Sequence, residues 1–222
     1  GDQPLAISPR VALQEAVKSL VDIGYMPKIG VEIEGYVLER NSTNQWVPWN
    51  TPTSYCYGTG VLADPVGLVD DIMTTAAKVG IPIETVSSEY ESSQFEFTIH
   101  YDDPIVAIDN TFLLKLLARE RAIEHGLMMT FLGRPFNDRG GSGIHLNISL
   151  TDSNGVNLFD KPDEKMGISQ LTYQAIAGAL AHHEGLTAIC APTVNSYKRL
   201  FPGQLSGYWA CLLYTSDAAD DS

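Results

Sequence analysis

Residues 94–100 alternate strictly between polar and apolar side chains, and this pattern constrains the fold of the chain more than any other feature. Phe95, Phe97 and Ile99 fall on one side, and Gln94, Glu96, Thr98 and His100 fall on the other. A period of two is that of a β-strand with one buried face. We therefore expect the apolar side to face a core. Taken alone, the side with Glu96 is a solvated face or the lining of a polar cavity.

Two other stretches show the same alternation. In residues 31–36, Val31 and Ile33 oppose Glu32 and Glu34. In residues 142–150, the apolar side is Ile144, Leu146, Ile148 and Leu150, and the polar side is Gly143, His145, Asn147 and Ser149. If the three strands share one sheet, the following residues converge: Glu32, Glu34, Glu89, Glu96 and His145. Crowded carboxylates are relieved by a proton or a cation, and an oxygen-rich site with one imidazole suits Mg²⁺ or Mn²⁺ better than zinc.

The composition narrows the class of partner and compartment. With 14 Lys and Arg against 27 Asp and Glu, the formal net charge is −13, which argues against a general nucleic-acid binder. A nucleotide stays possible, because divalent metals can supply the positive charge that phosphates need. Cys56, Cys190 and Cys211 form no CxxC pair, and we see no signal peptide and no run that spans a bilayer. We expect a cytoplasmic protein with no nucleic-acid or membrane partner.

The order of elements favours an α+β fold, an antiparallel sheet with flanking helices. Helices are expected from Ser8-Pro9 to Gly24, from Asp64-Pro65 to Gly80, from Asp103-Pro104 to His125-Gly126, and over residues 169–189. The third helix should bury Ile105, Ile108, Phe112, Leu116 and Ile123, and the second should bury Leu68, Ile72, Ala76 and Val79. Residues 81–100 should form a hairpin that turns near residue 92. The α+β class follows because strands come in antiparallel runs broken by helices, without regular βαβ alternation.

Two further segments are expected to be irregular. Residues 41–62, rich in Asn, Thr, Pro and Tyr, are predicted to form a long loop over the site, and residues 195–199 a polar, basic loop. His182-His183-Glu184 has the composition of a metal site, but adjacent residues on a helix point in different directions. We interpret that trio as structural or solvent-facing.

Four motifs in order resemble those of the glutamine synthetase family. They are Glu32-Ile33-Glu34, Glu89 followed by Gln94-Phe95-Glu96, Gly141-Ser142-Gly143-Ile144-His145, and the run from Ala191 to Leu200. The likeness covers roughly residues 8–210. It implies a catalytic core in which a curved antiparallel sheet forms half of a funnel between neighbouring subunits of a homo-oligomeric ring.

The resemblance also implies roles for individual residues. Glu34, Glu89 and Glu96 resemble the ligands of a first Mg²⁺ or Mn²⁺, and Glu32 and His145 resemble two of three ligands of a second. Gly141 occupies a position whose backbone contacts the glutamate substrate, and Arg199 one that grips it. Ser149 and Glu84 fall at nucleotide-contacting positions. Glu34 and Arg199 are the implied catalytic residues.

The implied reaction is that of an ATP-dependent carboxylate–amine ligase. The γ-carboxylate of glutamate takes the γ-phosphate of ATP, and an amine or ammonia displaces phosphate from the γ-glutamyl phosphate. Phosphoryl transfer of this kind needs positioning and charge neutralisation more than a protein nucleophile. Two divalent metals and an arginine would supply both.

Several residues depart from the family pattern. Glu91-Ser92-Ser93 replaces a Gly-Pro-Gly-like turn, Gly140 replaces an Asn, and Asn147 replaces a second His. Leu205 stands where ammonia-using members carry a Glu, and an apolar side chain neither attracts ammonium nor takes its proton. We therefore favour an alkylamine or polyamine acceptor. The alternatives are glutamate–ammonia ligase, a non-catalytic metal- and nucleotide-binding homologue, and a metal-dependent phosphohydrolase or guanidino kinase.

The resemblance finally suggests domain limits. Residues 1–210 form a catalytic domain that we expect to be truncated at both ends, with a β-grasp domain before Gly1 and further arginines and a metal ligand after Ala210. Residues 211–222 fit neither the helical nor the strand period, and we predict that they are not native to the domain. We expect no turnover by residues 1–222 alone.

Overall fold

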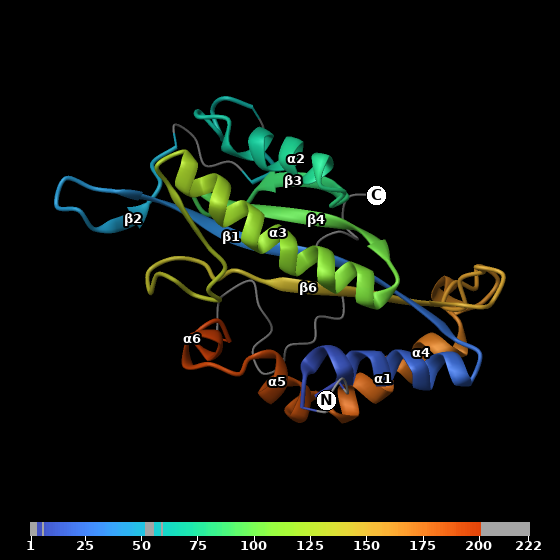
Figure 1. Cartoon of the computed structure of the whole chain (residues 1–222). Helices are drawn as coiled ribbons and strands as arrows, with labels where there is room; N and C mark the ends of the chain where they lie inside the picture. Colours follow the sequence, from blue (N-terminus) through green and yellow to red (C-terminus); the bar gives the residue numbers. More distant parts are fainter. Residues whose placement is uncertain (1–3, 6, 52–55, 59, 201–222) are drawn as a thin grey trace.

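The computed structural model describes residues 4–5, 7–51, 56–58 and 60–200 (Figure 1). The strands are β1 Met26–Arg40, β2 Trp46–Pro48, β3 Ile83–Ser88, β4 Gln94–Asp102, β5 Met128–Thr130 and β6 Ile144–Thr151. The helices are α1 Pro9–Asp22, α2 Leu68–Lys78, α3 Pro104–Glu124, α4 Gln170–Ala181, α5 His183–Cys190 and α6 Val194–Tyr197, with a 3₁₀ turn at Lys165–Gly167. The predicted non-native tail and Leu205 lie outside the described residues.

The strands form one antiparallel sheet with the long strand β1 at its centre. β4 pairs with β1 along one edge and continues to β3, and β6 pairs with the first half of β1 on the opposite edge. β5 and β2 pair with the last residues of β1. The α+β class and the antiparallel sheet are confirmed, as is the hairpin over residues 81–100. None of the helices in the described residues has the length and apolar composition needed to cross a bilayer.

Helices α2 and α3 cover one face of the sheet and form the core with it (Figure 1). The predicted apolar side of β4 is confirmed, because Phe95, Phe97 and Ile99 are each 3% exposed or less. They pack in one cluster with Leu68 and Ile72 of α2 and with residues of α3. The polar side of the strands therefore lies on the face away from these two helices.

The predicted inward face of α3 is wrong at three of its five residues, whereas Ile108 packs against the core. The helix buries a stripe of mostly small residues, Ala107, Thr111, Leu114, Ala118 and Ala122, whereas Phe112, Leu116 and Ile123 are exposed. Because α3 is apolar on more than one stripe, its period does not say which stripe faces the sheet. Small side chains let the helix approach the sheet closely, and large ones at those positions would not fit.

The predicted burial of the apolar side of β6 is also wrong. Ile144, Leu146 and Ile148 are 51%, 49% and 55% exposed, although Leu150 is buried. Their register partners Ile33, Val31 and Ile29 lie in the core. Within the described residues α3 contacts β1, β4 and β5 but not β6, so the helical layer ends before this strand.

Several predicted boundaries also need correction. Helix α2 begins at Leu68 and not at Asp64, whose carboxylate instead accepts hydrogen bonds from the N–H groups of Leu68 and Val69 at 3.0 and 2.8 Å. Val79 follows α2 and is exposed. The predicted helix over residues 169–189 is two helices, because His182 leaves the helical conformation with φ −109° and ψ 11°.

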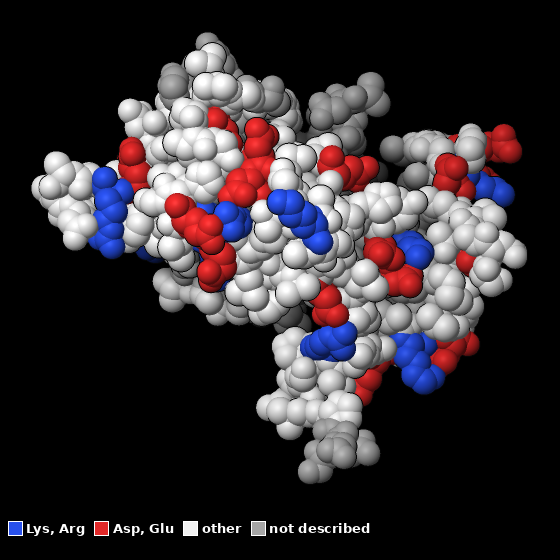
Figure 2. All heavy atoms as spheres, turned by 45° about the horizontal axis from the view of Figure 1, so that its top comes forward, with Lys and Arg blue, Asp and Glu red and all other residues white. Residues whose placement is uncertain are grey.

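The two segments predicted to be irregular each contain a short element. β2 lies within the predicted loop of residues 41–62. The loop predicted at residues 195–199 begins within α6, whose Thr193 cap accepts a hydrogen bond from the N–H of Ser196 at 3.1 Å. Charged side chains of both signs are interspersed on the face shown in Figure 2, which is mostly uncharged.

Candidate metal centre and its surroundings

The open face of the sheet carries the predicted polar side chains in register. Glu32 of β1 is paired with His145 of β6 on one side and with Thr98 of β4 on the other, and Glu34 is paired with Glu96. Directly paired residues on neighbouring strands project from the same face. Strand pairing alone therefore brings these side chains together from distant parts of the sequence.

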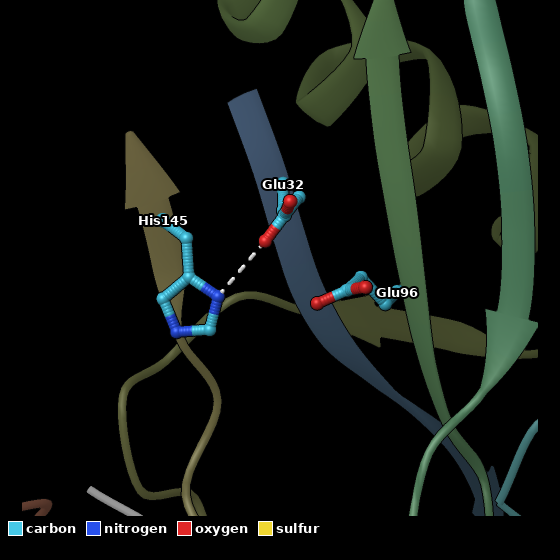
Figure 3. Close-up of side chains that lie close together, drawn as sticks. All are labelled: Glu32, Glu96 and His145. Carbon is cyan, nitrogen blue, oxygen red and sulfur yellow. Dashed lines mark hydrogen bonds and ion pairs between the residues drawn. The ribbon is translucent and has the colours of Figure 1, made fainter. Parts of the chain in front are cut away.

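Within the part of the chain that the structure describes, Glu32, Glu96 and His145 form a close group of potential ligands (Figure 3). One potential ligand atom from each residue lies within 4.8 Å of the other two. Each side chain comes from a different strand, and the three point toward one another above the sheet. Three strands thus fix the group without any loop.

Glu32 is buried and held at both carboxylate oxygens. His145 Nδ1 lies 3.1 Å from Oε2, and the side-chain amide of Asn147 donates to Oε1 at 2.8 Å. The hydrogen bond with His145 is the main cause that lowers the pKa of Glu32, and the same contact raises the pKa of His145. Asn147, a departure from the family pattern, therefore orients Glu32.

The pKa of Glu96 shifts in the opposite direction from that of Glu32. Its pKa is raised to about 7, chiefly by burial and then by the charges of Glu89, Glu32 and Glu34. A carboxylate in such surroundings is stabilised either by a proton or by a cation. The arrangement is therefore electrostatically suited to a divalent ion.

His145 provides a second indication that this group of side chains suits a divalent ion. Its Nε2 is buried and has no hydrogen-bond partner in the described part of the chain, while Nδ1 contacts Glu32. Histidine ligands commonly bind a metal through one ring nitrogen while a carboxylate orients the other. The donor set is carboxylate oxygens with one imidazole, which fits Mg²⁺ or Mn²⁺.

Glu34 and Glu89 border this group. Glu34 is the register partner of Glu96, and the charges of both Glu34 and Glu89 raise the pKa of Glu96. Among the described residues, however, neither Glu34 nor Glu89 belongs to a group of three ligand atoms as tight as 4.8 Å. The tight group also mixes residues that the resemblance divides between two metals.

Arg199 and the loop before β6 lie beside the same group. A Cβ placed on Gly143 would lie 2.6 Å from Arg199 Nη2, 2.9 Å from His145 Nε2 and 3.0 Å from Glu34 Oε1. A Cβ on Gly141 would lie 2.7 Å from the carbonyl oxygen of Gly133 and 2.8 Å from Arg199 Cγ. Both positions need glycine because other groups approach the backbone closely.

The predicted nucleotide-contacting residues lie farther along the sheet. Ser149 is on β6, opposite Lys28 of β1 and four residues beyond His145. Glu84 is exposed on β3, with Oε2 3.7 Å from His100 Nδ1. Neither residue belongs to the tight group.

Two residues that support the site had no assigned role in the sequence interpretation. Gln94 is 3% exposed and touches both Glu34 and the Gly141 loop. The side chain of Asn195 accepts from the N–H of Arg134 at 2.9 Å and donates to its carbonyl at 2.8 Å, which docks the segment that leads to Arg199. Their place in the motifs was visible in the sequence, but their contacts depend on the fold.

Comparisons with known proteins agree with this geometry. The family model of the glutamine synthetase catalytic domain matches residues 6–216. Glutamine synthetase of Halobacterium salinarum is 34% identical over 199 residues, covering 88% of this chain and 43% of that protein. Glutamate–isopropylamine ligase of a Pseudomonas species is 30% identical over 203 residues, covering 89% and 44%.

A solved structure gives the same result for the fold. The structure of GmaS without ligand superimposes with a TM-score of 0.81 at 31% identity, covering 90% of this chain and 47% of that one. The chain thus spans less than half the length of these relatives. From the matched family model, these relatives and the shared fold, we conclude that the chain belongs to the glutamine synthetase family.

Proposed function

We propose that this chain is the catalytic core of an ATP-dependent ligase that joins the γ-carboxylate of glutamate to an amine. The observation that carries the proposal is the group of Glu32, Glu96 and His145 beside Arg199, with a raised pKa at Glu96 and a buried imidazole nitrogen that has no hydrogen-bond partner among the described residues. A cation site next to an arginine suits a reaction in which a carboxylate attacks a phosphate, because both positive groups reduce the repulsion between the two anions.

In the first step, an oxygen of the γ-carboxylate attacks the γ-phosphorus of ATP, and the bond to the ADP oxygen breaks. The amine nitrogen then attacks the acyl carbon of γ-glutamyl phosphate, phosphate leaves, and the nitrogen loses a proton. Arg199 would hold the glutamate through its positive charge, and the backbone of Gly141 would orient it. Ser149 and Glu84 are the proposed nucleotide contacts.

Divalent ions would neutralise charge on the transferred phosphoryl group. Glu34, Glu89 and Glu96 would hold one Mg²⁺ or Mn²⁺, and Glu32 and His145 would contribute to a second. We also propose that the full-length protein supplies the remaining ligand of the second ion and assembles into a ring of subunits. Cytoplasmic localisation is part of the same proposal.

The choice of an amine over ammonia rests on Leu205 and is supported by the Pseudomonas relative, whose name specifies isopropylamine. Other relatives are named glutamine synthetase at similar identity, so ammonia is the alternative acceptor. Asn147 in place of a second histidine motivates the other alternative, a homologue that binds metal and nucleotide without turnover.

Phosphate release by the full-length protein tests these proposals. We expect release from ATP with Mg²⁺ only when glutamate and an amine are both present, and a higher kcat/KM for isopropylamine than for ammonium. Glu34→Gln should abolish turnover, and Arg199→Lys should raise the KM for glutamate, because lysine lacks the planar fork that binds a carboxylate.

The alternatives give different results. Preference for ammonium would indicate a glutamate–ammonia ligase. Mn²⁺ and ADP binding without turnover would favour the non-catalytic homologue. Phosphate release that does not depend on glutamate would indicate a phosphohydrolase, and phosphoryl transfer to a guanidino compound would indicate a kinase.

A further inference from the structure

Gln94 is a buried polar residue at the junction of the sheet and the loop before β6. It begins β4, directly opposite Tyr36 of β1, and lies on the same face as Glu96. Its side chain is almost fully enclosed. A buried amide costs stability unless its hydrogen bonds are made, so its partners are informative.

The Gln94 amide nitrogen has three acceptors around it. Nε2 lies 3.0 Å from Glu34 Oε2, 3.0 Å from the carbonyl oxygen of Gly141, and 3.2 Å from Ser142 Oγ. This environment fixes the orientation of the amide, because its oxygen in the same place would face a carboxylate and a carbonyl. One side chain therefore connects a candidate metal ligand with the loop that is proposed to bind glutamate.

The contact also determines which oxygen of Glu34 faces the site. Oε2 accepts from Gln94 and from the N–H of Gly143 at 2.9 Å. Oε1 lies on the side where Arg199 and His145 approach Gly143. Two donors on one oxygen hold the carboxylate in a single orientation and present the other oxygen to the site.

The loop has other tethers to the sheet that do not involve Glu34. The hydroxyl of Tyr36 donates to the carbonyl of Gly140 at 2.9 Å, and Glu91 Oε1 accepts from the N–H of Gly140 at the same distance. These tethers can position the loop without affecting the carboxylate. Their loss therefore separates loop position from carboxylate orientation.

We propose that Gln94 is a positioning residue that couples metal binding to glutamate binding by holding Glu34 and the Gly141 backbone in one arrangement. The inference rests on the proposed function, because it takes Glu34 as a metal ligand and Gly141 as a glutamate contact. Coupling of two sites is reciprocal, so Mn²⁺ should tighten glutamate binding as much as glutamate tightens Mn²⁺ binding.

The test is Gln94→Met in the full-length protein, a change that keeps the volume of the side chain but removes its donors. Mn²⁺ affinity is measured by EPR titration, and glutamate affinity by calorimetry with and without Mn²⁺. We expect Mn²⁺ affinity to fall by about 10- to 100-fold, as for other groups that orient metal ligands. The effect of Mn²⁺ on glutamate affinity should fall to less than about twofold.

Two variants serve as controls. Gln14→Met changes the same residue type on the exposed surface of α1 and should alter neither affinity. Tyr36→Phe removes a loop tether and should weaken glutamate binding while Mn²⁺ affinity stays at the wild-type value. If Gln94→Met does not fold by circular dichroism, Gln94→Asn replaces it, because a shorter amide cannot reach both partners.

The outcomes distinguish the inference from the function on which it rests. A wild-type protein that binds no Mn²⁺ would overturn both. Wild-type Mn²⁺ binding and coupling that persist in the Gln94 variant, with a lower melting temperature alone, would overturn the inference and leave the proposed function intact. Lost coupling in a folded variant supports it.

Discussion

Glu96 is partly buried among three other carboxylates, and its pKa is raised first by burial and then by their charges. The alternation of residues 94–100 was enough to place Glu96 on the polar face, because the period of a strand fixes the side of each residue. The sequence did not reveal that Gln94 and Asn147 orient Glu34 and Glu32. Such partners come from other strands, and their contacts depend on register.

We predict that Glu96→Gln stabilises the metal-free protein at alkaline pH. The folded-state pKa of about 7 lies above the ordinary value of 4.5, so folding favours the protonated form. The stabilisation is present in full below the ordinary pKa and is lost as pH rises through about 7. In EDTA, the variant should therefore melt above the wild type at pH 8 and close to it at pH 5. The exposed Glu15→Gln change is the control, and parallel pH profiles for Glu96→Gln and wild type would contradict the prediction.

Ser93 is a second residue that is unfavourably placed, both in its backbone conformation and in the burial of its hydroxyl. It has a left-handed backbone with φ of 67°, and its buried hydroxyl has no hydrogen-bond partner within the described residues. Ser93→Gly removes both costs, so we expect a gain of about 1 kcal/mol in the free energy of unfolding. Urea denaturation measures it. Ser87→Gly, within regular β3, should instead destabilise, and a loss of stability in Ser93→Gly would refute this account.

At the scale of elements, strands were easier to interpret than helices. The polar and apolar faces of β1 and β4 followed from alternation, because a strand has two faces and only one suits the core. The apolar surface of α3 extends over several stripes, and the sheet selects the stripe with small side chains. The half-exposed β6 shows a related limit, because alternation identifies an apolar face but not the layer that covers it.

Helices α2 and α3 are joined by Asp71, whose carboxylate accepts from Arg121 Nε at 2.8 Å and lies 3.0 Å from His125 Nε2. The hydrogen bond from Arg121 is the main cause that lowers the pKa of Asp71. A lowered carboxylate pKa stabilises the fold above the ordinary value of 3.8, and this stabilisation is lost as pH falls through the folded-state pKa. The contact therefore acts at neutral pH and not in strong acid.

We predict that Asp71→Asn lowers the free energy of unfolding by about 1 kcal/mol at pH 7, a modest value because the side chain of Asp71 is 27% exposed. The melting temperature should fall by about 2–4 °C. The difference should shrink as the pH falls below the ordinary value of 3.8, which calorimetry at pH 7 and pH 3 can test. Asp70→Asn, on the exposed side of the same helix, is the matched control. An equal loss at pH 3 would show that packing, and not charge, is responsible.

For the molecule as a whole, one arrangement produces both the core and the candidate site. Helices cover one face of the antiparallel sheet (Figure 1). The other face is left to polar side chains, and neighbouring strands bring them together. The sequence predicted the class of fold and the residues that gather. It could not give the strand order β6, β1, β4, β3, because pairing between strands so distant in sequence depends on the folded chain.

The edge strand β6 should respond to metal more than any other part of the sheet. In the described residues its one strand partner is β1, and three of its four apolar side chains on one side are about half exposed, which indicates low local stability. A cation bound by Glu32, Glu96 and His145 would link β6 to β1 and β4. We predict that Mn²⁺ slows amide hydrogen exchange in residues 144–151 while exchange in α3 changes little. His145→Ala should abolish the Mn²⁺ effect, whereas equal slowing in α3 and β6 would mean that the ion stabilises the whole fold and does not act as a link between these strands.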